Sequence, residues 1–149
     1  MKFSLAVGTL YYYPLRTVFR WARDAGFDGI ELCVNPEVIA RGGQAVRQLA
    51  IQEGIELLSV HPTVIPLPGW WERGAGIDPT IRLAQQAGAQ VVVMHTPRSR
   101  SLESGEGQTF RRKVEMWQPR LAGSGLRLAI ENKAIHADAQ RYYALSPLD

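Results

Sequence analysis

Short apolar runs alternate with amphipathic segments along this chain of 149 residues, and this alternation constrains its fold more than any other feature. The apolar runs predict strands at 3–7, 29–33, 55–60, 91–94 and 126–130. The fourth run is Val-Val-Val-Met, which is typical of a strand buried on both faces of a parallel sheet. Because strands that alternate with helices pair in parallel through helical crossovers, the sequence predicts an α/β protein made of repeated β/α units.

Helical segments separate the predicted strands. The second and third segments open with Asn35-Pro36 and Asp78-Pro79, in which a capping side chain precedes a proline at the first helical position. Gly42-Gly43 interrupts the second segment, so its main helix is predicted over 44–53. A polar loop is predicted over 96–107, and an amphipathic helix follows it.

Two architectures fit this order of elements. A five-stranded doubly wound sheet needs about this length, whereas a complete eight-stranded barrel takes about 250 residues, of which this chain would form part. The first strand is followed by Gly8-Thr9-Leu10-Tyr11, which is not a glycine-rich phosphate-binding loop. The sequence therefore argues against nucleotide or flavin binding, but the pattern alone leaves both architectures open.

Ionisable side chains follow three successive predicted strands at the same point, namely His61, His95 and Glu131. The carboxyl ends of parallel strands lie along one edge of a sheet, so we expect these side chains to converge there. Two imidazoles and one carboxylate suit zinc, manganese, iron or cobalt better than calcium. The spacing therefore favours a divalent metal site over the alternative of hydrogen-bonded surface histidines.

The strand-end sequences Gly-Ile-Glu-Leu at 29–32 and Ile-Glu-Asn at 130–132, together with His61 and His95, resemble the xylose-isomerase-like TIM-barrel superfamily. That superfamily includes sugar and sugar phosphate isomerases and epimerases, and the zinc-dependent endonucleases of AP endonuclease family 2. The resemblance extends over essentially the whole chain. It implies a partial TIM barrel of about five strands and four helices, forming one domain over 1–149.

The resemblance also implies roles for individual residues. Glu131 is expected to bind a divalent metal (manganese, zinc, magnesium or cobalt) and to act as the catalytic acid and base, and His95 and His61 to bind the metal or the substrate. Glu31 is expected to line the substrate side of the pocket, unless it caps the following loop. Trp70 and Trp71 lie in a long loop over the predicted site and are expected to stack on a sugar ring, the alternative being a packed loop anchor.

The function that these expectations indicate is that of a sugar or sugar phosphate isomerase or epimerase, which transfers a proton next to a carbonyl. One alternative is a zinc-dependent AP endonuclease-like DNA repair protein, favoured by the two histidines and a sequence pI of about 9.3. No basic stripe with interleaved aromatics is present, so a small sugar is the expected partner and nucleic acid is not. Another alternative is a non-catalytic fragment.

We also expect the chain to be truncated and its metal site incomplete. The resemblance implies further ligands after strands six to eight, whereas only His136, Asp138 and Asp149 follow Glu131, in a loop-like tail. Ser146-Pro147 at the end reads as the start of a helix. An inactive fragment is therefore expected.

A half-barrel also leaves two sheet edges open. Self-association is expected through these edges and through apolar side chains left uncovered at Leu5, Ile30 and Ile130. No apolar run approaches the roughly 18 residues of a membrane span. The single cysteine, Cys33, rules out an intramolecular disulfide and fits a cytoplasmic protein.

Overall fold

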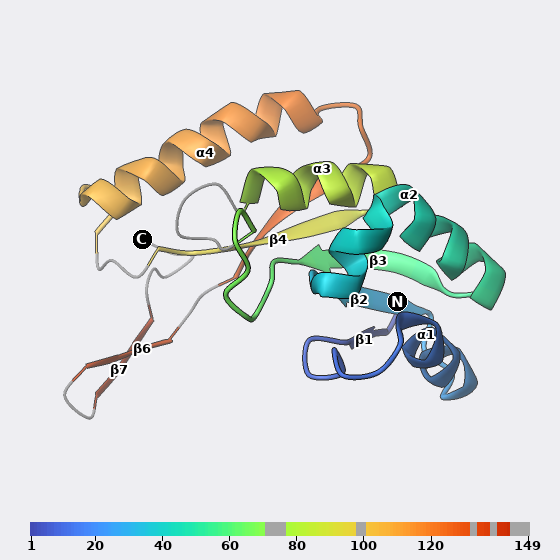
Figure 1. The fold of residues 1–149 in the computed structure, drawn as a ribbon. Coiled ribbons are helices and arrows are strands. Elements are labelled where there is room, and N and C mark those ends of the chain that lie inside the picture. The colour runs from blue at the N-terminus through green and yellow to red at the C-terminus, as the bar shows by residue number, and fades with distance from the viewer. Residues whose placement is uncertain (71–76, 98–100, 132–133, 138–139, 144–149) are drawn as a thin grey trace. The chain divides into compact units, whose positions relative to one another are not determined.

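The structure is a computed structural model that describes residues 1–70, 77–97, 101–131, 134–137 and 140–143. The chain divides into two compact units, Met1–Val92 and Val93–Asp149. Figure 1 labels their helices and strands. The first unit contains β1 (Ser4–Ala6), α1 (Leu15–Asp24), β2 (Gly29–Cys33), α2 (Pro36–Glu53), β3 (Glu56–His61), α3 (Ile77–Ala87) and the start of β4 (Val91–His95). The second contains the end of β4, α4 (Gly105–Leu121), β5 (Arg127–Glu131), β6 (Ala134–Ala137) and β7 (Gln140–Tyr143).

The strands β1 to β5 form one sheet in the order β1-β2-β3-β4-β5. The pairs β1–β2, β2–β3 and β3–β4 are parallel. Strands that follow one another in the chain are therefore neighbours in the sheet throughout. A doubly wound sheet reverses its strand order at a switch point, and a TIM barrel does not. The observed order thus confirms the prediction of a partial barrel and excludes the doubly wound alternative.

The glycine pair interrupts the second helix, as predicted. Asn35 caps α2, since its side-chain oxygen accepts from Val38 N at 3.0 Å, and Pro36 takes the first helical position. Gly42 has φ 73° and ψ 160°, which is not helical, so α2 consists of two helical segments joined by a kink at this residue. Gly43 is buried against α3, where a Cβ atom would lie 2.6 Å from the Leu83 carbonyl oxygen. Figure 1 shows α2 and α3 side by side.

A buried carboxylate joins α1 to the end of α2. Glu53 is 4% exposed and accepts from Arg20 Nε at 2.8 Å, while Arg16 Nε lies 3.4 Å away. Arg23 donates to the Glu53 backbone carbonyl at 3.0 Å. The hydrogen bond from Arg20 lowers the pKa of the Glu53 carboxyl and outweighs the opposing effect of its burial. Charged groups from α1 therefore compensate the desolvation of this side chain.

The second unit departs from the prediction in two places. Helix α4 begins at Gly105, inside the predicted polar loop, because the Ser104 hydroxyl accepts from Gly107 N at 3.0 Å and caps it. The tail after Glu131 was predicted to be loop-like, which is wrong for the strands β6 and β7. These pair as an antiparallel hairpin in which Ala134 is opposite Tyr143. Asp138, Asp149 and the predicted helix start at Ser146 lie outside the described residues.

The apolar side chains expected to be uncovered differ in their exposure. Ile130 on β5 is 54% exposed, as expected, whereas Leu5 on β1 is half-buried. The prediction is wrong for Ile30, which is 0% exposed. Its side chain lies on the face of β2 that the helices cover, because successive strand residues point to opposite faces. Self-association through the sheet edges stays a prediction. Among the described residues, no helix combines the length and apolarity of a membrane span.

Candidate metal centre

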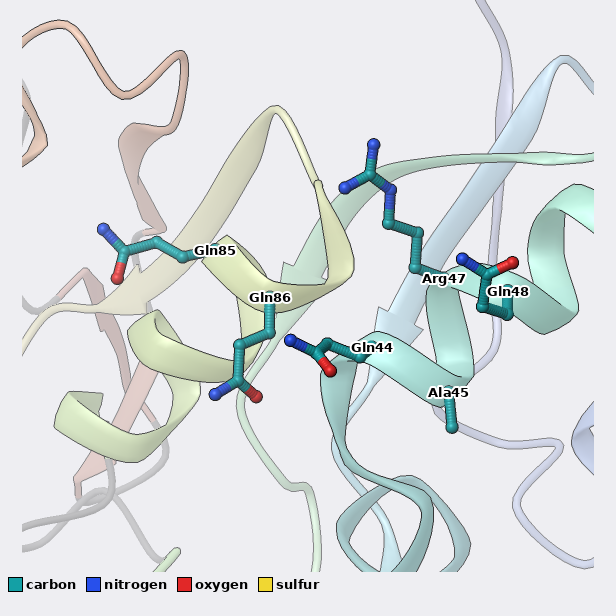
Figure 2. A pocket seen from close by; sticks show the side chains of 6 residues that line it. All are labelled: Gln44, Ala45, Arg47, Gln48, Gln85 and Gln86. Carbon is teal, nitrogen blue, oxygen red and sulfur yellow. The ribbon is translucent and has the colours of Figure 1, made fainter.

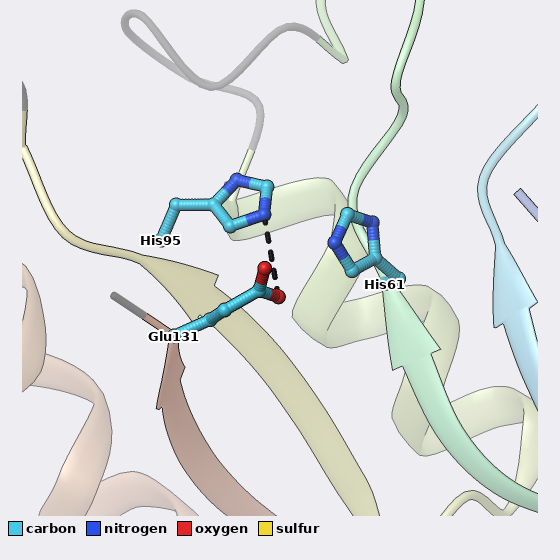
Figure 3. Close-up of side chains that lie close together, drawn as sticks. All are labelled: His61, His95 and Glu131. Atoms are coloured by element: carbon cyan, nitrogen blue, oxygen red, sulfur yellow. Dashed lines mark ion pairs between the residues drawn. The ribbon is translucent and has the colours of Figure 1, made fainter. Parts of the chain in front are cut away.

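Two of the predicted ligands lie at the ends of β4 and β5, within the second unit. Thr96 follows His95 and is buried, and its backbone N donates to the Glu131 carbonyl at 3.1 Å. This hydrogen bond brings the two strands to an end at the same level. His95 Nε2 then lies 3.6 Å from Glu131 Oε2 (Figure 3). The structure therefore brings His95 and Glu131 together, as the sequence predicted.

The spacing of this pair suits a shared ion. A distance of 3.6 Å exceeds the roughly 3.0 Å of a good hydrogen bond. Two ligand atoms about 2.1 Å from a tetrahedral zinc ion lie about 3.4 Å apart, which is close to the observed separation. The His95 side chain is 7% exposed and the Glu131 side chain 52% exposed. The His95 side chain is thus held within the fold, whereas the Glu131 side chain is open to solvent.

His61 ends β3 in the first unit, and its backbone is held there because Val34 N donates to its carbonyl at 3.0 Å. Its ring Nδ1 lies 2.7 Å from the Pro62 carbonyl oxygen. A carbonyl only accepts, so Nδ1 is the donor and the neutral ring carries its proton there. In the neutral ring the lone pair of His61 is therefore on Nε2. A backbone carbonyl that sets the tautomer in this way is typical of metal-binding histidines.

The predicted substrate-binding residues lie at different places in the structure. Glu31 lies in the middle of β2, half-buried, where it accepts from the Ser59 hydroxyl at 2.9 Å. Trp70 is half-buried in a turn, with its backbone N donating to the Leu67 carbonyl at 3.0 Å. Trp71 lies outside the described residues. Ser59 was not predicted as a site residue; its signal is a polar side chain between the apolar Leu58 and Val60, two residues before His61.

Cys33 is the last residue of β2 and is 3% exposed. Its Sγ donates to the Pro62 carbonyl at 3.3 Å. Burial raises the pKa of the Cys33 thiol, and the neighbouring Glu31 carboxylate adds to the rise. The thiol is therefore protonated and unreactive at neutral pH.

Two surface grooves lie apart from these residues. In the first unit, α2 and α3 border a polar groove of about 530 Å³ (Figure 2). Its lining is Gln44, Ala45, Arg47, Gln48, Gln85 and Gln86. In the second unit, α4 and β5 border a groove of about 740 Å³ that is mainly apolar. No predicted site residue lines either of these grooves.

Fold and strand order define part of a TIM barrel with ionisable residues at its strand ends. Residues 19–141 match the family model of the xylose isomerase-like TIM barrel. The chain belongs to this family. An uncharacterized protein of Mycobacterium tuberculosis is 35% identical over 141 residues, which cover 89% of this chain and 48% of the relative. The chain thus spans about half the length of the curated relatives it matches.

Solved structures share the fold at low sequence identity. An AP endonuclease, family 2, from Brucella melitensis has a TM-score of 0.64 and 18% identity, covering 87% of this chain and 55% of its own. A D-tagatose 3-epimerase-like protein has a TM-score of 0.57 and 18% identity, covering 91% and 54%. The IOLI protein, solved with a bound zinc atom, has a TM-score of 0.58 and 14% identity, covering 87% and 51%. These likenesses establish the fold alone.

Proposed function

We propose that this chain is part of a metal-dependent isomerase or epimerase of sugars or sugar phosphates, in which Glu131 and His95 hold a divalent cation. The observation that carries this proposal is the 3.6 Å approach of His95 Nε2 to Glu131 Oε2 at the ends of β4 and β5. Imidazole and carboxylate together suit zinc, manganese or cobalt, and magnesium is the fourth candidate. Epimerase-like and zinc-bound proteins of the same fold support the proposal.

His61 is proposed as the third ligand. It ends β3, as His95 ends β4 and Glu131 ends β5, and functional residues of a TIM barrel come from the carboxyl ends of its strands. Each of the three offers one ligand atom of a suitable kind. The Pro62 carbonyl holds the His61 proton on Nδ1 and leaves Nε2 as the ligating atom.

In the proposed reaction Glu131 is the acid and base. A divalent cation at this site polarises a carbonyl and so acidifies the adjacent carbon. The Glu131 side chain, which is 52% exposed, takes the proton from that carbon and returns it. Trp70, Trp71 and Glu31 are proposed to contact the sugar. Because the chain spans about half of its relatives, we also propose that it holds only part of the ligand set and is inactive alone.

Metal content tests the ligand assignment. After equilibration with zinc and then gel filtration, the wild-type chain should retain about one zinc per chain, measured by plasma mass spectrometry. Glu131→Ala and His95→Ala should each lose at least about tenfold in affinity, while His61→Ala tests the third ligand separately. Glu115→Ala removes an exposed carboxylate of α4 and is the matched control. Equal zinc retention by all variants would remove the assignment.

The zinc-dependent nuclease is the second candidate, favoured by the pairing of two histidines with one carboxylate. It predicts binding to a duplex with an abasic site that weakens steeply with salt. The isomerase proposal predicts instead exchange of the proton next to the carbonyl of a ketose in deuterated water, by the complete protein. Salt-sensitive preference for the abasic duplex, without this exchange, would replace the first candidate by the second.

A further inference from the structure

Two neighbouring strands of the first unit carry a hydrogen-bonded pair that the proposed metal chemistry does not use. Ser59 Oγ donates to Glu31 Oε2 at 2.9 Å, and the two residues are partners in the β2–β3 register. Both side chains are half-buried. A carboxylate has about four lone-pair positions, and Ser59 occupies one of them. Glu31 therefore retains the capacity to accept from further donors.

The pair faces away from the helices. Ile30 and Leu32 flank Glu31 on β2 and are each 0% exposed on the helix-covered face, so Glu31 points to the opposite face. On β3, His61 follows Ser59 by two residues and shares its face, about 7 Å further along the strand. The Glu31 carboxylate thus lies on the same face as His61, a proposed metal ligand, and further from the carboxyl ends of the strands.

The chemistry of this face favours neutral donors. The strands β1, β2 and β3 contain no lysine or arginine. A sugar hydroxyl can donate to Glu31, whereas the phosphate group of a sugar phosphate acts as an acceptor at neutral pH and brings a like charge to a half-buried carboxylate. We propose, on the basis of the function proposed above, that Glu31 is the acceptor that selects the hydroxyl groups of an uncharged sugar over a sugar phosphate. Ser59 positions that carboxylate.

The test compares a neutral sugar with its phosphate ester. Titrations of the zinc-equilibrated chain with D-fructose and with D-fructose 6-phosphate, followed by amide NMR, give the two dissociation constants. The wild type should bind D-fructose more tightly. Glu31→Gln should weaken D-fructose binding about tenfold, the loss of one hydrogen bond to a charged group, and leave the phosphate ester unchanged or tighter. Ser59→Ala should weaken D-fructose binding less, and Ser59→Thr should restore it.

Glu56→Gln is the matched control, since Glu56 begins β3, at the opposite end of the strand from His61, and pairs with the exposed Lys2. It should change neither constant. Three outcomes would overturn the inference: no D-fructose binding by the wild type, equal losses for both sugars in Glu31→Gln, or no loss at all. Zinc retention by the same variants separates the two proposals. A wild-type chain that retains no zinc would refute the proposed metal site. A Glu31→Gln variant that retains zinc and keeps the sugar preference of the wild type would refute only the role of Glu31.

Discussion

The close approach of α2 to α3 predicts that Gly43→Ala destabilises the protein. In a helix this change is normally favourable by up to about 1 kcal/mol, because alanine has the higher helix propensity. At Gly43 the added Cβ would lie 2.6 Å from both the Leu83 carbonyl oxygen and Gln86 Cβ, and 3.0 Å from Ala87 N. Ordinary contacts need about 3.5–4.0 Å, so the helices must separate by several tenths of an ångström.

The magnitude follows from which atoms are crowded. Overpacking costs about 1–3 kcal/mol, and the upper end applies here because two of the crowded atoms belong to the backbone of α3 and cannot rotate away. After the propensity gain, a net loss of about 2 kcal/mol in the free energy of unfolding remains. Urea unfolding followed by far-UV circular dichroism measures it.

The matched control is Gly105→Ala, at a helical glycine of α4 whose added Cβ meets nothing within 4 Å. It should be neutral or stabilise by up to about 1 kcal/mol. If Gly43→Ala unfolds at the same urea concentration as the wild type, or at a higher one, the close packing of α2 on α3 is refuted.

Three further predictions concern the first unit. Because Arg20 holds the pKa of the Glu53 carboxyl below its ordinary value of about 4.3, this group stabilises the fold fully above that pH. This stabilisation is lost as the pH falls through the lowered pKa of Glu53 in the folded state. The acid unfolding of Glu53→Gln should therefore lack this pH-dependent contribution. Identical acid-unfolding profiles of the variant and the wild type would contradict the prediction. Asn35→Ala removes the cap of α2 and should cost about 1 kcal/mol in urea unfolding, with Asn35→Asp close to the wild type. Nitrogen-15 NMR of His61 should report a proton on Nδ1 in the neutral ring, and the Nε2 tautomer would contradict the hydrogen bond to Pro62.

Local chemistry explains where sequence reasoning succeeded. The β2 strand is the run predicted, and the Asn35-Pro36 start of α2 is observed, because periodicity and capping depend on residues within one or two turns. His95 and Glu131 were predicted to meet because each directly follows an apolar run, which marks the end of a strand in the sequence. The same reasoning missed the cap at Ser104, which precedes a glycine-rich turn with few apolar residues. It also missed the β6–β7 hairpin.

The order of apolar runs and polar strand ends was thus determined by the sequence alone, and with it the α/β class and the candidate ligands. Only the tertiary structure decided that neighbouring strands follow chain order, which separates a barrel from a doubly wound sheet. It also decided that Gly43 serves helix packing and that Ser59 holds Glu31. Periodicity says which face of an element is buried, but it carries no information about which distant element covers that face. Contacts between residues far apart in sequence supply that information.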